Sequence, residues 1–290
     1  MMKNHDPARF GCRLELHTSG ELPADNEIKS PLVVFVHGFT ADGEYFRSHA
    51  DYVQRSGYDS AYFHYDSYLG INDAAAMLGD RLKSCQRAIR KHGLVFVGHS
   101  LGGLVVRAAI RYHLPKMVES VRGMVLLGTP NDGTLIDSRI VSRMLDWGQT
   151  ISQKFALNPY TRSTACRSAK ELVQSDPQQF LRRLNDAERG QPASTPTWTI
   201  SGGKKFIELG GGLWDFLGNK SLQRIFAGAQ NDGLVPEASV DLGLILKNHE
   251  NRLHVNGYPD YWKTNHTALA VNQSIAIKIV DFLRQFAPPR

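Results

Sequence analysis

The chain has 290 residues, of which 42% are hydrophobic and 21% are charged. This composition excludes a disordered or fibrous protein, and every apolar run is far shorter than the ~18 residues that a bilayer-spanning helix needs. The 34 basic and 28 acidic residues leave a net charge of +6. That balance weakly favours contact with an anionic membrane surface or with an acidic partner. Without a dense Lys/Arg cluster it does not indicate nucleic-acid binding.

The amino-terminal segment MMKNHDPARFGCRLELH contains no apolar stretch of the kind found in secretion signals. The three cysteines, Cys12, Cys85 and Cys166, are too few and too scattered for a disulfide framework or a zinc site. They fit a reducing compartment. We therefore expect a cytoplasmic protein that holds no metal.

Three short apolar segments at 31–39, 93–103 and 121–130 are rich in Val or Leu and end in Gly, His or Pro. Continuous apolar runs of this length are typical of strands buried on both faces, as in a parallel sheet. Weaker strand patterns occur at 12–17, 60–65, 195–201 and 253–255.

Helical patterns alternate with these strands. Apolar residues recur at helical spacing in 73–89, in 101–113 and in the closing segment 266–286. Such alternation predicts an α/β fold, with a mostly parallel central sheet flanked by helices and joined by right-handed crossovers. We interpret residues 1–290 as one domain.

The segment 134–193 interrupts the alternation, because it carries helical patterns and no convincing strand. Two interpretations remain open. The segment is either a helical subdomain that packs on the sheet or a cap over an active site, and its length exceeds that of an ordinary connection between a strand and a helix. We predict the cap.

The sequence GHSLG at 98–102 fits the G-x-S-x-G pattern, and it lies between a predicted strand and a predicted helix. In this context a sharp turn projects the central hydroxyl above the sheet edge, and the flanking glycines leave room for the turn. The helix that follows directs its amino terminus at the same point. Ser100 is therefore the predicted nucleophile, and the N–H of Leu101 is a predicted donor to the oxyanion of an acyl-transfer transition state.

Five motifs resemble those of lipase-like serine esterases in the α/β-hydrolase superfamily, a group that includes bacterial lipases and the GPI inositol-deacylase-like esterases. They are PLVVFVHGF, GHSLGG, LLGTPNDGT, QNDGLVP and TNHTAL, and the likeness runs from about Leu32 to Leu283. The resemblance implies the α/β-hydrolase fold. It also implies that the residue after His-Gly supplies the second oxyanion donor, which is Phe39 here.

A serine nucleophile needs a histidine base and an orienting acid, in the chain order Ser, Asp or Glu, His. Of the histidines after Ser100, His113 follows too soon, and His249 and His254 lie in a polar strand-like stretch where a solvent-facing position is expected. His266 stands after the last strand pattern, at the predicted start of the closing helix. The segment around it resembles the family's catalytic-histidine loop, so His266 is the predicted base.

Two Asn-Asp-Gly sequences satisfy the order for the acid. Asp232 continues as Gly-Leu-Val-Pro and resembles the acid loop of lipases. Asp132 follows an earlier strand, and it is also a candidate for a turn or for a helix cap. We predict Asp232 and keep Asp132 as the alternative.

Phe39, Leu101 and Leu234 are predicted to line the site, and Trp147 and Phe155 of the segment 134–193 are further candidates for contact with substrate. These residues favour an apolar acyl group. Calcium-dependent lipases of similar sequence carry Asp two residues after the catalytic histidine, whereas this chain has Ala268. The sequence therefore predicts neither calcium nor a cofactor, and it contains no dinucleotide-binding fingerprint.

The sequence thus predicts a serine hydrolase that cleaves small-molecule or lipid carboxylic esters through an acyl-enzyme. Two alternatives remain open. One is an acyltransferase that uses the same three residues, and the other is a non-catalytic binding protein that keeps the fold.

Overall fold

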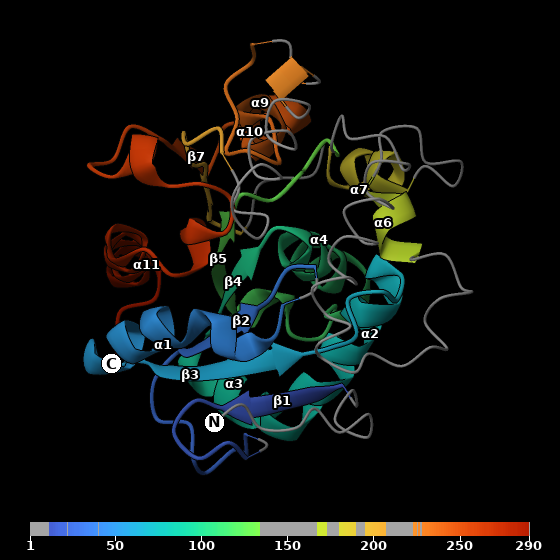
Figure 1. Ribbon diagram of the computed structural model, residues 1–290. Helices are drawn as coiled ribbons and strands as arrows, with labels where there is room; N and C mark the ends of the chain where they lie inside the picture. Colours follow the sequence, from blue (N-terminus) through green and yellow to red (C-terminus); the bar gives the residue numbers. More distant parts are fainter. Residues whose placement is uncertain are drawn as a thin grey trace, which may run out of the picture.

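The computed structural model describes residues 12–21, 23–39, 41–133, 167–172, 180–189, 195–206, 223–224, 226 and 228–289. Its centre is a seven-stranded sheet with the order β1-β3-β2-β4-β5-β6-β7 (Figure 1). The strands are β1 (Arg13–Leu16), β2 (Leu32–Val36), β3 (Asp59–His64), β4 (Leu94–His99), β5 (Val121–Leu127), β6 (Thr197–Ile200) and β7 (Arg252–Val255).

Only β1 is antiparallel to its neighbour, and every other pair of adjacent strands is parallel. The predicted mostly parallel sheet is therefore confirmed. Every residue of β2 and of β4 is buried, as expected for strands covered by helices on both faces. Because the strands from β2 to β7 run the same way, their carboxyl ends meet at one edge of the sheet. Loops from that edge carry the candidate site.

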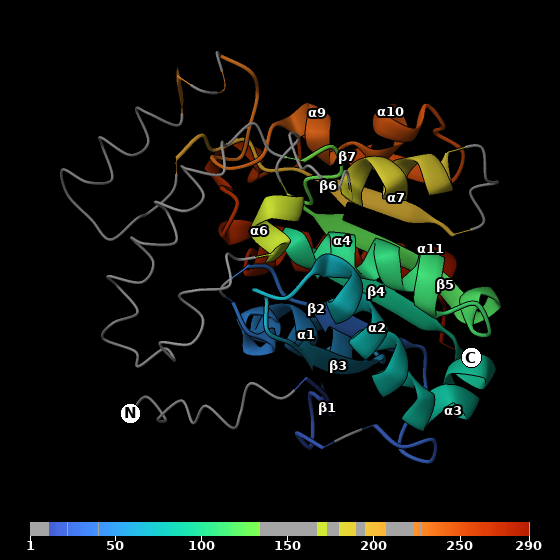
Figure 2. The same cartoon turned by 90° about the vertical axis from the view of Figure 1, so that its right-hand side faces the viewer.

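Helices cover both faces of the sheet (Figures 1 and 2). On one side lie α2 (Ile71–Arg81), α3 (Gln86–His92) and α4 (Leu101–Ala108), and on the other lie α1 (Arg47–Arg55) and α11 (Gln273–Phe286). The other helices within the described ranges are α6 (Arg167–Glu171), α7 (Phe180–Glu188), α9 (Glu237–Val240) and α10 (Leu242–Leu246). A π-helical turn (Ala109–His113) continues α4, and 3₁₀ turns lie at Gly43–Phe46, Leu82–Cys85, Val118–Ser120, Tyr261–Lys263 and Ala268–Ala270.

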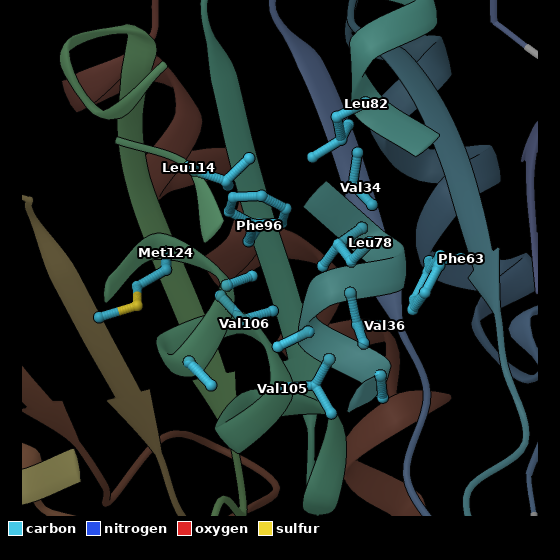
Figure 3. Packing of buried hydrophobic residues seen from close by; sticks show 14 of the residues in the cluster. Val34, Val36, Phe63, Leu78, Leu82, Phe96, Val105, Val106, Leu114 and Met124 are labelled. Atoms are coloured by element: carbon cyan, nitrogen blue, oxygen red, sulfur yellow. The ribbon is translucent and has the colours of Figure 1, made fainter. Parts of the chain in front are cut away.

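Alternate strand residues divide the core between the two layers. Val34 and Phe96 pack with α2 and α4 in one buried cluster, shown in Figure 3. Their neighbours Val33 and Val95 pack with α1 and α11 in the other. Successive side chains of a strand point to opposite sides of the sheet. Because helices cover both sides here, these segments have no polar face.

The segment predicted as one helix at 73–89 is two helices separated by a 3₁₀ turn at Leu82–Cys85. Side chains from this turn and from a distant loop explain the break. The Ser84 hydroxyl donates to the carbonyl of Arg81, and the Asp25 carboxylate accepts from the N–H of Ala88 in the first turn of α3. Each bond satisfies a backbone group that a continuous helix would have used.

The closing helix also begins later than predicted. Asn272 caps α11 by accepting from the N–H of Ser274, so the helix starts at Gln273. His266 lies on the preceding loop. The 3₁₀ turn at Ala268–Ala270 buries Leu269, and its apolar residues extended the helical pattern in the sequence.

Within the predicted cap segment 134–193, the structure describes α6 and α7 and the residues next to them. Phe180, Leu181 and Leu184 of α7 belong to the same buried cluster as α2 and α4, and Figure 2 shows both helices on that side of the sheet. The described part of the segment therefore packs on the sheet layer. Whether the rest covers a substrate stays a prediction. In the described chain, no helix combines the length and the apolar character needed to cross a bilayer.

Candidate active site

Ser100 occupies the sharp turn between β4 and α4. Its backbone has φ 52° and ψ −125°, a combination that an L-residue adopts only under strain from its surroundings. The N–H of Ser100 donates to the carbonyl of Leu127 at the end of β5, over 2.8 Å. The side chain stays partly exposed. The strand–turn–helix context predicted for Ser100 is thus present.

The glycine after this turn is required by a close approach of the backbone. A methyl group on Gly102 would overlap the carbonyl oxygens of Val36 and His37, where β2 ends. The first turn of α4 therefore packs directly against the end of β2. This contact brings the amino terminus of α4 next to the loop that begins with His37-Gly38.

His266 and Asp232 form a buried pair at the same sheet edge. His266 Nδ1 lies 2.7 Å from Asp232 Oδ2, and the two residues are 4% and 1% exposed. A second bond joins the two loops, because the N–H of His266 donates to the carbonyl of Asp232 over 2.8 Å. The imidazole is therefore held in one orientation, with Nε2 left for another partner.

The other oxygen of Asp232 has its own donors. The N–H groups of Leu234 and Val235 donate to Oδ1 over 3.0 and 2.8 Å. Two backbone N–H groups thus hold Oδ1 of Asp232, while Oδ2 faces Nδ1 of the imidazole.

Gly128, which follows β5, leaves the space that this pair occupies. Its φ is +56°, and a methyl group there would lie 3.0 Å from both Asp232 Oδ2 and His266 Nδ1. A residue with a side chain would be strained by the backbone and would press on the hydrogen bond. The turn after β5 therefore contributes to the site although it carries none of the predicted catalytic residues.

The two predicted oxyanion donors belong to residues that begin α4 and follow the loop after β2. Leu101 is the first residue of α4, so its N–H has no carbonyl partner one turn earlier in the helix. Gly38 of the other loop is so close that a methyl group on it would lie 3.0 Å from Ser100 Cβ. Phe39 follows directly, and its ring contacts Tyr68 at 5.1 Å between centroids.

Three buried histidines surround the site. His37, His49 and His99 are 1%, 0% and 5% exposed. Burial lowers the pKa of His37 and of His49 to about 4. Burial, followed by the neighbouring imidazole of His266, lowers the pKa of His99 to about 3. All three rings are therefore neutral at pH 7.

Of the two acid candidates, the structure brings Asp232 to His266. Asp132 is exposed, and its N–H donates to the Ser239 hydroxyl over 3.1 Å. Although the residue as a whole is exposed, neighbouring groups partly desolvate its carboxyl and raise the carboxyl pKa, against the opposing charge of Arg189.

Of the two other histidines considered as the base, His249 is exposed as expected. The expectation for His254 was wrong, because its side chain is only 12% exposed. Its Nδ1 lies 3.0 Å from the Thr199 hydroxyl on the neighbouring strand.

The predicted pocket residues have different positions. The side chain of Leu101 is 1% exposed and belongs to the buried cluster with α2 and α4, and its contact with a substrate stays a prediction. Phe39 and Leu234 are partly exposed and remain candidates. Trp147 and Phe155 lie outside the described residues.

Sequence reasoning missed a buried polar network that joins α4, the loop after β5 and α7. Arg107 of α4 is 1% exposed. Its guanidinium donates to Asn131 after β5 over 3.0 Å, and to Asn185 and Glu188 of α7 over 2.7 and 3.0 Å. Asn131 in turn donates to the carbonyl of Val240 over 2.7 Å. The only signal in the sequence was an arginine in an otherwise apolar helix.

The sequence model of the α/β hydrolase fold family matches residues 31–257. The chain therefore belongs to the α/β hydrolase fold family, in agreement with the sheet order and with the turn at Ser100. No curated protein sequence matches the chain.

Solved structures show the same fold at low identity. The mature lipase BlEst2 of Bacillus licheniformis has a TM-score of 0.63 and 19% identity over 89% of this chain and 93% of its own. A lipase-esterase related protein of Clostridium acetobutylicum has a TM-score of 0.55 and 15% identity over 93% of this chain and 99% of its own. Lipase B of Aspergillus fumigatus has a TM-score of 0.55 and 16% identity over 99% of this chain and 57% of its own.

Proposed function

We propose that this chain is a serine hydrolase that cleaves carboxylic esters through an acyl-enzyme on Ser100. One observation carries the proposal. A strained, partly exposed serine and a buried pair of histidine and carboxylate, 2.7 Å apart, share one edge of the sheet. The rings of His266 and of His99, the residue before Ser100, are 4.8 Å apart between centroids. The base is therefore adjacent to the nucleophile turn.

The proposed mechanism follows from these positions. Ser100 Oγ attacks the ester carbonyl carbon while His266 Nε2 accepts the hydroxyl proton. Asp232 holds the imidazole and stabilises the imidazolium that forms. The N–H groups of Leu101 and Phe39 donate to the oxyanion of the tetrahedral intermediate.

The intermediate collapses when the ester C–O bond breaks, and the departing alcohol takes the proton from His266. Water then attacks the acyl-enzyme with His266 again as the base, which releases the acid and restores Ser100. Every step uses groups of the chain itself, so the proposal includes neither a metal nor a cofactor.

We further propose a small-molecule or lipid ester with an apolar acyl group as the substrate. Phe39 and Leu234 are partly exposed, and they follow Gly38 and Asp232 closely in the sequence, which supports an apolar surface beside the proposed site. Three solved structures with a similar fold are named as lipases or as a lipase-esterase related protein. We place the protein in the cytoplasm, where the positive net charge would favour contact with anionic membrane surfaces.

The test is labelling of the purified protein with a fluorophosphonate probe, together with hydrolysis of p-nitrophenyl esters of increasing chain length. We expect labelling and hydrolysis by the parent protein. Both should be lost in Ser100→Ala, which should keep the parent's circular dichroism because the change removes a single oxygen atom. A parent protein that is neither labelled nor active would support a binding protein instead.

Adding an alcohol acceptor separates hydrolysis from acyl transfer. A serine hydrolase releases mainly the free acid, whereas an acyltransferase passes the acyl group to the acceptor. A dominant transfer product would replace the proposed reaction while keeping the same three residues.

A further inference from the structure

His99 is a buried polar residue next to the proposed nucleophile, and the proposed mechanism gives it no role. It ends β4 and precedes Ser100, and it is 5% exposed. Its neighbours are chiefly other rings, with Tyr45, Phe46 and His266 at 6.2, 6.4 and 4.8 Å between centroids. A polar side chain in such surroundings needs a reason, because an apolar residue would fill the space without desolvating a polar group.

The hydrogen bond of His99 supplies that reason. His99 Nε2 lies 2.8 Å from the main-chain carbonyl oxygen of His266. A carbonyl oxygen only accepts, so Nε2 carries the proton and donates. His266 is thus fixed at three points: its carbonyl by His99, and its N–H and its Nδ1 by Asp232.

The opposite side of the ring faces the oxyanion loop. A methyl group on Gly38 would lie 3.1 Å from His99 Nδ1 and 3.0 Å from Ser100 Cβ. Within the described chain, this Nδ1 is buried and has no hydrogen-bond partner. The imidazole therefore lies between the loop after β2 and the loop after β7, directly behind the nucleophile.

We propose that His99 is a positioning residue that fixes the base His266 relative to Ser100, by donating from Nε2 to the carbonyl of His266. The inference rests on the proposed function, because it assigns His266 as the base. In this role His99 needs no contact with the reacting serine oxygen or with a substrate. It acts through the loop that carries the imidazole.

His49 offers a matched control. It is also fully buried, and its Nε2 lies 3.0 Å from a main-chain carbonyl oxygen, that of Asn272. The acceptor belongs to the cap of α11, not to the base. Removal of the donor from His49 therefore imitates the structural loss at His99 without moving the base.

The experiment compares His99→Met and His99→Gln with His49→Met. Met fills the space without a donor, whereas the side-chain amide of Gln reaches the position of Nε2. Displacement of a catalytic group by about 1 Å costs roughly 10²-fold in rate. We expect His99→Met to lose about that factor in kcat and in the rate of fluorophosphonate labelling, with KM little changed. His99→Gln should recover most of the loss, and His49→Met should keep the parent's kcat.

Three results would overturn the proposal: a parental kcat in folded His99→Met, an equal loss of kcat in His49→Met, or a loss confined to KM. If His99→Met does not fold, His99→Asn replaces it. The shorter amide of Asn does not reach the Nε2 position, so its kcat should stay well below that of His99→Gln. Equal activity of the Asn and Gln variants would contradict the role.

A second measurement does not depend on activity. The proton between His266 Nδ1 and Asp232 should give a low-field resonance in the proton NMR spectrum. We expect this signal to persist in His99→Gln and His49→Met and to broaden or vanish in His99→Met. An unchanged signal in His99→Met would refute the positioning role. A parent protein with the signal but with no labelling would refute the proposed function alone.

Discussion

The three neutral histidines around the site should make the fold sensitive to mild acid. An unfolded histidine has a pKa near 6.5, whereas burial lowers the pKa of His37 and His49 to about 4 and that of His99 to about 3. Because the folded values lie below the unfolded ones, this contribution to stability is fully present above pH 6.5. This contribution is lost as the pH falls from 6.5 toward 4, because over that range these histidines take up protons mainly in the unfolded chain.

The size of the effect follows from proton linkage. At pH 5 the three residues bind about 2.7 more protons in the unfolded state, which gives a slope of about 3.7 kcal/mol per pH unit. Summed from pH 8 to pH 5, the loss is about 6 kcal/mol, a large part of the 5–15 kcal/mol that stabilises a typical domain. His64 adds to the loss, because burial and then Arg13 lower its pKa. The raised pKa of Asp132 acts in the opposite direction.

The assay is urea unfolding, followed by tryptophan fluorescence, of the parent, His49→Gln and His249→Gln at pH 8 and at pH 5. Comparison of variants cancels the groups that they share. Between the two pH values, His49→Gln should gain about 2 kcal/mol relative to the parent, because one buried histidine no longer takes up a proton on unfolding. His249→Gln removes an exposed histidine and controls for the loss of an imidazole ring itself. A difference between His49→Gln and the parent that is the same at both pH values would refute the reasoning.

Three further predictions concern the acid, the cap and the buried arginine. Asp232→Asn should reduce kcat by roughly 10⁴-fold, because an amide neither fixes the imidazole nor stabilises its cation. Asp132→Asn should change kcat little. If steady-state kinetics gave the larger loss for Asp132→Asn, the acid would be Asp132, after the earlier strand. Trp147→Ala and Phe155→Ser should shift chain-length preference on p-nitrophenyl esters more than the rate on the acetate, and an unchanged profile in stable protein would favour a structural subdomain over a cap. Arg107→Met should lower the free energy of unfolding in urea by about 3–5 kcal/mol, because it leaves buried polar groups without their partner. Arg182→Met, at an exposed ion pair, should lower it by less than about 1 kcal/mol. Equal losses in the two variants would contradict the buried network.

The elements that the sequence predicted well are those with local causes. The apolar runs of β2, β4 and β5 lack a polar face because helices cover both sides of the sheet. The turn at Ser100 follows from glycine spacing between a strand and a helix. The pairing of Asp232 with His266 followed from chain order and from resemblance, and it did not need knowledge of the packing.

The rest depends on partners that are distant in the sequence. The break after Arg81 is stabilised partly by Asp25, and the Arg107 network joins residues from separate elements. His99 bonds to a residue 167 positions away. Nothing near these residues distinguishes a buried hydrogen-bond donor from an exposed one. The position of His266 was misjudged for a different reason, because an apolar 3₁₀ turn continued the helical period of α11.

Site geometry and acid sensitivity therefore share one cause. His99 holds the base loop as a neutral ring, and a charged ring 4.8 Å from His266 would oppose the imidazolium that forms there during attack. The burial that keeps His99 neutral also means that, at mildly acidic pH, this histidine is protonated in the unfolded chain and not in the folded one. His99→Gln keeps the donor and removes the titrating group. Relative to the parent, it should thus gain about 2 kcal/mol of unfolding free energy between pH 8 and pH 5, while it keeps most of kcat. Urea unfolding and ester hydrolysis of the same preparation check both parts. An active His99→Gln without that gain would show that His99 titrates normally in the folded protein, and the link between positioning and acid sensitivity would be wrong.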